Sequence, residues 1–321
     1  YKLPYVAPGD WYGRTGDWRT DQNVPPVQYQ IMWLSAWVRE FGIDGFRCDT
    51  QKHVEDVYWG QLKDACQEAL IAWRGDSSKS DGGSGAKLWD ENFWMTGECF
   101  GWTSTAGQGS AYTTGKFDSM INFSFNGSSG GTGRTPTESD WSSYASINQN
   151  NPDSDGNGNI NNVLSYVSSH DTGLHRPGDQ RVLGTMLCLL PGGVQIFYGD
   201  ETARPGIDGY GDADMSTRGD MNWDAATAES AVHWSKIGKF RKFNPAVGAG
   251  IQTISGTTYK RIYTGTAGSN QVAICISGSA ADVSGMFGDG TTVYNWYDGS
   301  SAVVSGGAVS FPSSASTTSP W

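Results

Sequence analysis

The sequence predicts an α/β region of parallel strands joined by crossover helices, followed by an antiparallel β-sandwich. Up to about residue 244, helical apolar periodicity alternates with short strand-like runs. From Pro245 onward the sequence pattern changes to short runs of alternating apolar and polar residues, separated by glycines. The 321 residues, 37% of them hydrophobic and 12% aromatic, are enough for one large and one small core. We therefore expect domains at 1–244 and 245–321, the first an open doubly wound sheet or a closed barrel.

The elements of the first domain can be placed in order. After a Gly/Asp/Trp-rich opening, apolar residues from Ile31 to Phe41 recur at helical spacing, with Gly42 as the stop. A strand in GIDGFRCD, a helix in VEDVYWGQLKDACQEALIAWR, a loop at 75–86 and a strand in FWMTGECF follow. Next come FDSMINFSF, a polar insertion at 127–160, NVLSYVSSHD, the helix DQRVLGTMLCLL, the strand GGVQIFYGDE and the helix SAVHWSKIGKFRKF. The sandwich strands are expected in YKRIYTG, QVAICISG, TTVYNWYDG and SAVVSGGAVSFP.

Composition and charge exclude several classes of function. The net charge of −11 and the lack of any basic run argue against nucleic acid and anionic membrane surfaces as partners. No apolar run is long enough to span a membrane, and YKLPYVAPGD is not a signal peptide, so we expect a soluble chain. The five widely spaced cysteines form no CxxC pair, which favours buried thiols over a zinc site or a disulfide framework.

Charged residues stand at the carboxyl ends of three expected strands: Asp49 after GFRC, Glu98 after WMTG and Asp171 after SYVSSH. In a parallel α/β fold this is the edge where sites are built. Any one of them alone could be a helix cap or a loop carboxylate. Three in successive units favour a shared site. Strand alternation further directs Arg47 and Asp49 to one face, and Phe46 and Cys48 to the other.

The motifs GFRCDTQKH, TGECF and VSSHD, followed by GGVQIFYGDE, resemble the signature regions and the last barrel strand of the α-amylase family, glycoside hydrolase family thirteen. The likeness covers nearly all of the chain. It implies a (β/α)8 TIM barrel, of which this chain supplies about strands 4 to 8, followed by the family's C-terminal β-sandwich domain. It also implies a secreted or periplasmic enzyme that acts on starch and maltooligosaccharides.

By position, the resemblance implies that Asp49 is the catalytic nucleophile, Glu98 the general acid/base and Asp171 the carboxylate that holds the sugar. Retaining hydrolysis needs an ionised carboxylate and a protonated carboxyl about 5 to 5.5 Å apart. Arg47 would keep Asp49 ionised, unless it forms a purely structural ion pair. Phe100 and Trp102 would give Glu98 the apolar surroundings that suit a general acid.

Further positions match the family less closely. The resemblance implies sugar contacts for Lys52, His53 and His170, and a bond to calcium from the His53 carbonyl. Asp17, in a residual calcium-binding region at the N-terminus, lines up with a calcium-binding aspartate. Asp214 and Arg218 have the spacing of a substrate-side pair, for which a surface salt bridge is the alternative. Trp102 and Tyr112 are expected to stack on sugar rings, and DSDGNGN at 153–159 reads as a polar loop, because it lacks the twelfth-position glutamate of an EF-hand.

One family feature is missing. No histidine follows an asparagine, so the first signature region, a DxxxNH-like stretch, is absent, and a circular permutation is excluded because nothing like it follows VSSHD. A companion N-terminal fragment of the same enzyme is therefore expected to complete the barrel, since an open half-barrel leaves strand edges unpaired. The leading hypothesis is a calcium-containing, endo-acting α-amylase that cleaves α-1,4-glucosidic bonds with retention. The alternatives are a transglycosylase of the same family and a catalytically silent starch-binding fragment.

Overall fold

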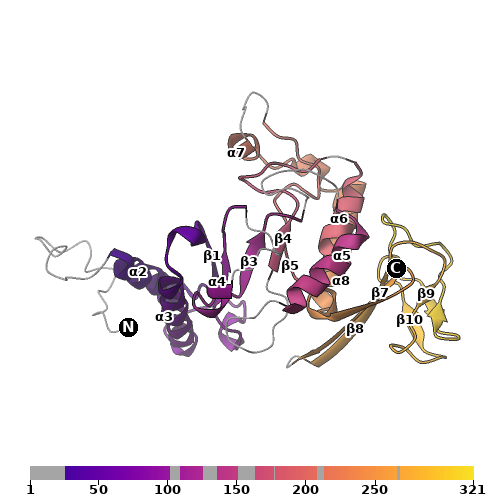
Figure 1. The fold of residues 1–321 in the computed structure, drawn as a ribbon, viewed down its shortest axis with the longest axis horizontal. Helices are drawn as coiled ribbons and strands as arrows, with labels where there is room; N and C mark the ends of the chain where they lie inside the picture. The colour runs from indigo at the N-terminus through magenta and orange to yellow at the C-terminus, as the bar shows by residue number, and fades with distance from the viewer. Residues whose placement is uncertain are drawn as a thin grey trace, which may run out of the picture. The chain divides into compact units, whose positions relative to one another are not determined.

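The computed structural model describes residues 26–101, 109–125, 136–150, 163–176, 178–207, 213–265 and 268–321 (Figure 1). These residues divide into two compact units. The first holds residues 26–99 and 109–118, and the second holds the other described residues. The predicted polar loop at 153–159 lies outside the described residues.

The first unit is a strand–helix–strand arrangement with a helix in front of it. Its elements are α2 (Pro26–Phe41), β1 (Gly45–Cys48), η1 (Gln51–His53), α3 (Asp56–Gly75), η2 (Ala86–Leu88), β2 (Trp94–Gly97) and α4 (Gly109–Thr113). β1 and β2 pair in parallel, with α3 as the crossover. The predicted stop of α2 is confirmed. Gly42 has φ 66° and its N–H donates to the Val38 carbonyl at 2.8 Å. A Cβ on Gly42 would meet the Trp73 ring at 2.4 Å, so glycine also allows α2 and α3 to pack closely.

The second unit continues the alternation and then becomes antiparallel. Its α/β part comprises β3 (Ser119–Asn122), α5 (Glu138–Asn150), β4 (Val163–Tyr166), α6 (Gln180–Cys188), β5 (Gly193–Gln195), α7 (Ala213–Ser216), η3 (Trp223–Ala225), α8 (Glu229–Phe243) and α9 (Ala246–Ala249). Its β part comprises β6 (Ile251–Ser255), β7 (Thr258–Gly265), β8 (Gly268–Cys275), β9 (Ala281–Asp282), β10 (Thr292–Tyr294), β11 (Ser301–Val303) and β12 (Ala308–Val309). β3, β4 and β5 pair in parallel, whereas β6–β7–β8, β10–β11 and β12–β9 pair antiparallel. The predicted fold class, a partial barrel followed by antiparallel sheets, is confirmed.

Helix α5 lies within the stretch that the sequence analysis treats as a polar insertion. Its start carries a capping signal: the Asp140 carboxylate accepts a hydrogen bond from the Thr137 N–H at 2.8 Å. One face is apolar, since Trp141 is fully buried and Tyr144 is 6% exposed. The Trp141 indole donates to the Met186 carbonyl at 3.0 Å and its ring meets Tyr259 of β7 edge-on at 4.9 Å. Residues on both sides of position 244 thus share one core, and the predicted domain boundary stays a prediction.

A buried arginine shapes the turn from α6 into β5. Arg241 on α8 donates to the carbonyls of Cys188 at 3.1 Å and Leu190 at 2.8 Å, and also to that of Gly192. Burial lowers the pKa of Arg241 to about 10. Its three carbonyl partners satisfy the guanidinium and fix the backbone that leads into β5.

All five cysteines are buried free thiols, as predicted. Burial raises the pKa of Cys48, Cys66 and Cys188 to about 12, so these thiols stay protonated and unreactive. Within the described part of the chain, no helix is long and apolar enough to cross a membrane.

His233 joins α8 to α6 and to the C-terminal sheets. Its Nε2 lies 2.9 Å from the Thr185 hydroxyl and its Nδ1 lies 2.8 Å from the Tyr297 hydroxyl. Because the Thr185 hydroxyl donates its proton to the Thr317 carbonyl at 2.6 Å, it must accept from Nε2, which leaves Nδ1 to accept from Tyr297. The neutral imidazole therefore satisfies both bonds, whereas a protonated ring would lose the bond from Tyr297.

This geometry predicts a pH-dependent stability. Burial, aided by the nearby Arg181, lowers the pKa of His233 to about 4. Below about pH 6.5 the unfolded chain binds a proton that the folded chain does not take up until about pH 4, so the free energy of unfolding falls as the pH falls through this interval. The full loss is about 3 kcal/mol. Denaturant unfolding between pH 7 and pH 4 should show this fall in the free energy of unfolding in the parent protein, and His233→Gln should lack it. An equal fall with pH in both proteins would contradict the role given to His233.

Candidate active site

Asp49 and Glu98 follow the carboxyl ends of two strands that pair in register. Cys48 of β1 lies opposite Gly97 of β2, and the Glu98 N–H donates to the Cys48 carbonyl at 2.8 Å. The residues that come next, Asp49 and Glu98, therefore leave the sheet side by side. The structure places both at the carboxyl edge of a parallel sheet, as the sequence predicts.

A left-handed turn at Thr50 directs the Glu98 side chain toward the Asp49 segment. Thr50 has φ 52° and ψ 39°. In a regular parallel ladder the Thr50 N–H would bond the Glu98 backbone carbonyl. Here Gln51 supplies that bond at 2.7 Å, and the Thr50 N–H instead donates to the Glu98 carboxylate at 3.0 Å. A threonine in this conformation costs on the order of 1 kcal/mol, a strain often found at functional sites.

The two carboxyl groups occupy different environments. The Asp49 side chain is 66% exposed and forms an ion pair with Arg47, whose side chain is 33% exposed. Glu98 is only 4% exposed. On the opposite face of β1, Cys48 is buried and Phe46 meets the Phe93 ring edge-on at 5.1 Å, so the predicted alternation along this strand is confirmed. One exposed carboxylate beside a guanidinium and one buried carboxyl make a pair suited to different chemical roles.

Lys52 and His53 lie in the single turn of η1, directly after this pair, and both are exposed. Gln51, in the same turn, is 4% exposed and its amide donates to the Asp56 carboxylate at 2.7 Å, which fixes the turn at the start of α3. The turn therefore presents two polar side chains next to Asp49, where the sequence analysis expects sugar contacts.

Asp171 lies after β4 between two basic groups. The His170 Nε2 is 3.0 Å from one carboxylate oxygen of Asp171, and the Arg218 Nη2 is 3.7 Å from the other. The backbone N–H of Asp171 donates to the Ser169 hydroxyl at 3.3 Å, which starts a tight turn. Arg218, expected beside Asp214, thus reaches Asp171. The Asp214 side chain lies outside the described residues, so that pair stays a prediction.

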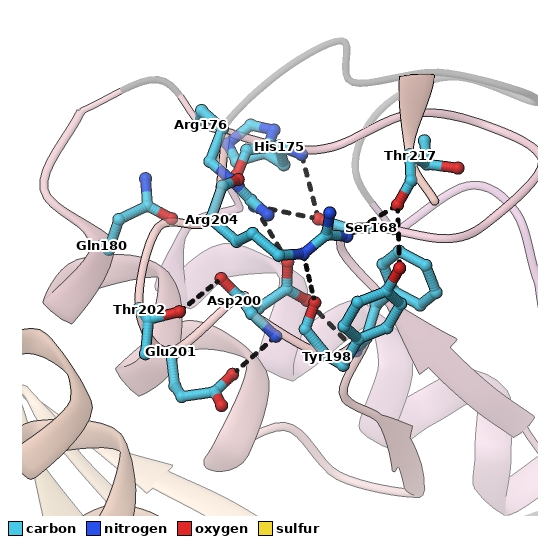
Figure 2. A network of polar contacts seen from close by, with 12 residues as sticks. Ser168, His175, Arg176, Gln180, Tyr198, Asp200, Glu201, Thr202, Arg204 and Thr217 are labelled. Carbon is cyan, nitrogen blue, oxygen red and sulfur yellow. Dashed lines mark hydrogen bonds and ion pairs between the residues drawn. The ribbon is translucent and has the colours of Figure 1, made fainter. Parts of the chain in front are cut away.

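The loops after β4 and β5 are joined by a buried polar network (Figure 2). Asp200 is fully buried and accepts a hydrogen bond from Arg176 at 2.9 Å. Burial raises the pKa of Asp200, and hydrogen bonds from Ser168 and Arg176 oppose that rise. Arg176 also donates to the Arg204 carbonyl at 2.7 Å, so the loop that carries Asp171 is anchored on the loop after β5.

Three of the expected site residues have other outcomes. Asp17 and Trp102 lie outside the described residues. Tyr112 is expected to stack on sugar rings, but this is wrong: its side chain in α4 is only 1% exposed, and burial raises the pKa of its phenol. Thr50 is not predictable from the sequence, because threonine rarely adopts a left-handed conformation and no sequence pattern marks it. The sequence analysis does not identify Arg204, although Gly199 in GVQIFYGDE is a signal: a Cβ there would meet Arg204 at 2.4 Å.

Among the described residues, no group of three or more His, Cys, Asp or Glu side chains is placed to hold a metal ion. The His53 carbonyl would therefore need further calcium ligands from outside the described residues. The described residues alone do not fit a complete calcium site.

Comparison with known proteins agrees with the fold. The chain is 42% identical over 233 residues to the periplasmic alpha-amylase of Escherichia coli K12, an alignment that covers 71% of this chain and 32% of that protein. It is 26% identical over 284 residues to an alpha-amylase of Streptomyces lividans, covering 76% of this chain and 28% of that protein. The chain thus spans about a third of the length of these relatives. No family model matches it.

Among solved structures, the alpha-amylase of Geobacillus thermoleovorans, crystallised with acarbose, has a TM-score of 0.63 at 17% identity, covering 92% of this chain and 62% of that one. At this identity the likeness shows the fold alone. Parallel strands followed by antiparallel sheets give this chain the fold of part of a TIM barrel with its C-terminal domain. The resemblance to the α-amylase family is confirmed for the part of those proteins that this chain matches.

Proposed function

We propose that the protein carrying this chain is an α-amylase that cleaves internal α-1,4-glucosidic bonds of starch and maltodextrins with retention. The observation that carries the proposal is the Thr50 N–H bond to the Glu98 carboxylate, which holds Glu98 beside the Asp49 segment. The named activities of the two curated relatives support the substrate class.

In the proposed reaction the Asp49 carboxylate attacks the anomeric carbon, and the Glu98 carboxyl gives its proton to the departing glycosidic oxygen. The C–O bond breaks as the glycosyl–Asp49 ester forms. Glu98, now ionised, then takes a proton from water, and the resulting hydroxide displaces Asp49. The ion pair with Arg47 orients the Asp49 carboxylate before it attacks.

The remaining residues bind sugar in this proposal. Asp171 and His170 hold hydroxyl groups of the glucose that reacts, and their contact at 3.0 Å orients both. Lys52 and His53 contact the leaving-group side. Asp214 and Arg218 contribute on the substrate side, as does Trp102 by stacking.

The test is product analysis with maltoheptaose. Hydrolysis with retention gives shorter linear maltooligosaccharides whose new reducing end is first the α-anomer, which NMR detects before mutarotation. Longer or cyclic products as the main outcome would instead establish a transglycosylase, in which a sugar hydroxyl replaces water. No cleavage at all would leave a starch-binding role.

We further propose that other residues of the enzyme, in the same polypeptide or a companion fragment, complete the barrel. The share of each curated relative that the chain covers, 32% and 28%, supports this. The name of the Escherichia coli relative supports a periplasmic or secreted location.

Calcium is proposed to bind through Asp17 and the His53 carbonyl and to tie the loops of the catalytic region together. Dialysis against a chelator should then lower the thermal midpoint, and added calcium should restore it. The free energy of unfolding should fall by about 3 kcal/mol if calcium is present at about 100 times its Kd before dialysis. An unchanged midpoint after dialysis would contradict a structural calcium.

A further inference from the structure

Arg204, in the loop after β5, is a buried cation whose partners are backbone carbonyls. It is 1% exposed. Its Nη2 donates to the Thr217 carbonyl at 2.6 Å, its Nη1 to the Gly219 carbonyl at 3.1 Å and its Nε to the Tyr198 carbonyl at 3.2 Å (Figure 2). The guanidinium also stacks on the Tyr198 ring, 4.0 Å from its centroid. Burying a charge is costly unless such bonds satisfy it, so a residue held this way serves a specific arrangement.

The two outer carbonyls flank Arg218. One guanidinium fork therefore fixes the backbone on both sides of the residue that reaches Asp171. The Tyr198 hydroxyl adds a bond to the Gly219 carbonyl at 2.9 Å. A lysine could not reproduce this grip, because an ammonium lacks the planar fork that spans two acceptors.

The same segment is tied to the loop that carries Asp171. The Thr217 hydroxyl donates to the His170 carbonyl at 3.0 Å, next to the Arg218 contact with Asp171 at 3.7 Å. The Arg218 side chain is 46% exposed. An ion pair this exposed contributes little free energy when both side chains move freely. Arg218 is held in one position against Asp171 only if its backbone is fixed.

We propose that Arg204 is a positioning residue for the sugar-holding carboxylate: through the Thr217 and Gly219 carbonyls it keeps Arg218 against Asp171. The inference rests on the role proposed above for Asp171. Arg204 itself touches neither the substrate nor the reacting atoms. The competing account is that Arg204 only stabilises the fold.

A double-mutant cycle separates the two accounts. In the full-length protein that contains this chain, Arg204→Lys should lower kcat on maltoheptaose by about tenfold to a hundredfold with a smaller change in KM. The double variant Arg204→Lys/Arg218→Lys should have a kcat no lower than that of the less active single variant, because Arg204 acts through Arg218. Arg241→Lys is the matched control, because it also removes a guanidinium that donates to backbone carbonyls. Its fold-reduction in kcat should multiply with that of Arg218→Lys in the double variant. If the fold-reductions in kcat of Arg204→Lys and Arg218→Lys also multiply, the proposal is overturned.

A second readout does not need activity. Trypsin cleaves after Arg218, and the rate at this bond, followed by mass spectrometry well below the thermal midpoint, reports how firmly the segment is held. Arg204→Lys should raise that rate severalfold while Arg241→Lys leaves it unchanged. An unchanged rate in Arg204→Lys would refute the proposal. If the parent protein cleaves no α-glucan, the proposed function fails, and the trypsin rate still decides whether Arg204 holds Arg218.

Discussion

Replacing Asp49 by asparagine is expected to lower kcat/KM for starch by at least about 10³-fold, as the loss of a catalytic nucleophile does in other enzymes. The amide has nearly the same shape as the carboxylate but cannot form the glycosyl ester. Stability should change little, because the Asp49 side chain is 66% exposed and its ion pair with Arg47 lies at the surface. The measurement is reducing-end release from soluble starch, alongside a thermal unfolding curve.

Asp64→Asn is the matched control for this variant. Asp64 is also an exposed aspartate with an ion-pair partner, Lys116 at 2.7 Å, but it lies on α3 away from the strand end. It should retain full activity. An Asp49→Asn protein as active as the parent would remove the nucleophile assignment.

Replacing Glu98 by glutamine should separate the two catalytic steps. Starch cleavage needs a proton on the leaving oxygen, so it should fall by at least about 10²-fold, the lower range for loss of a general acid. Maltosyl fluoride needs no such proton, because fluoride leaves unaided. The rate of the first step with this substrate, in which fluoride is released, should therefore be largely retained. The glutamine can still accept the Thr50 N–H bond, which keeps the local geometry.

The outcome is read by comparing fluoride release in the first turnover with starch cleavage in steady state. Glu68→Gln, an exposed position on α3, serves as the control and should leave both unchanged. Equal losses on starch and on the fluoride would contradict the role of Glu98 as general acid.

Much of the fold follows from local signals in the sequence. The helix before Gly42 and the alternation along GFRCD are set by apolar spacing and by a single glycine, and the structure has both. Helix α5 was missed because its apolar face is narrow and its neighbours are polar. Its start was nevertheless marked by a threonine and an aspartate three residues apart, a capping pattern that hydrophobic periodicity ignores.

The site was predictable where it depends on strand ends and not where it depends on loops. Asp49 and Glu98 could be placed together because parallel strands bring their carboxyl ends to one edge. The turn at Thr50 could not be foreseen, because it depends on the competition between a backbone carbonyl and a side chain for one N–H. Likewise, Arg218 was assigned to Asp214 by spacing, whereas its contact with Asp171 spans loops far apart in sequence.

The most direct test of the account asks where the sugar becomes attached. Glu98→Gln protein is incubated with maltosyl fluoride, denatured and digested, and the peptides are weighed. Because the second step lacks its base, a maltosyl group should accumulate on the peptide that contains Asp49. A maltosyl group on any other peptide, or fluoride released with no labelled peptide, would contradict the claim that Asp49 and Glu98 act as a nucleophile and acid/base pair.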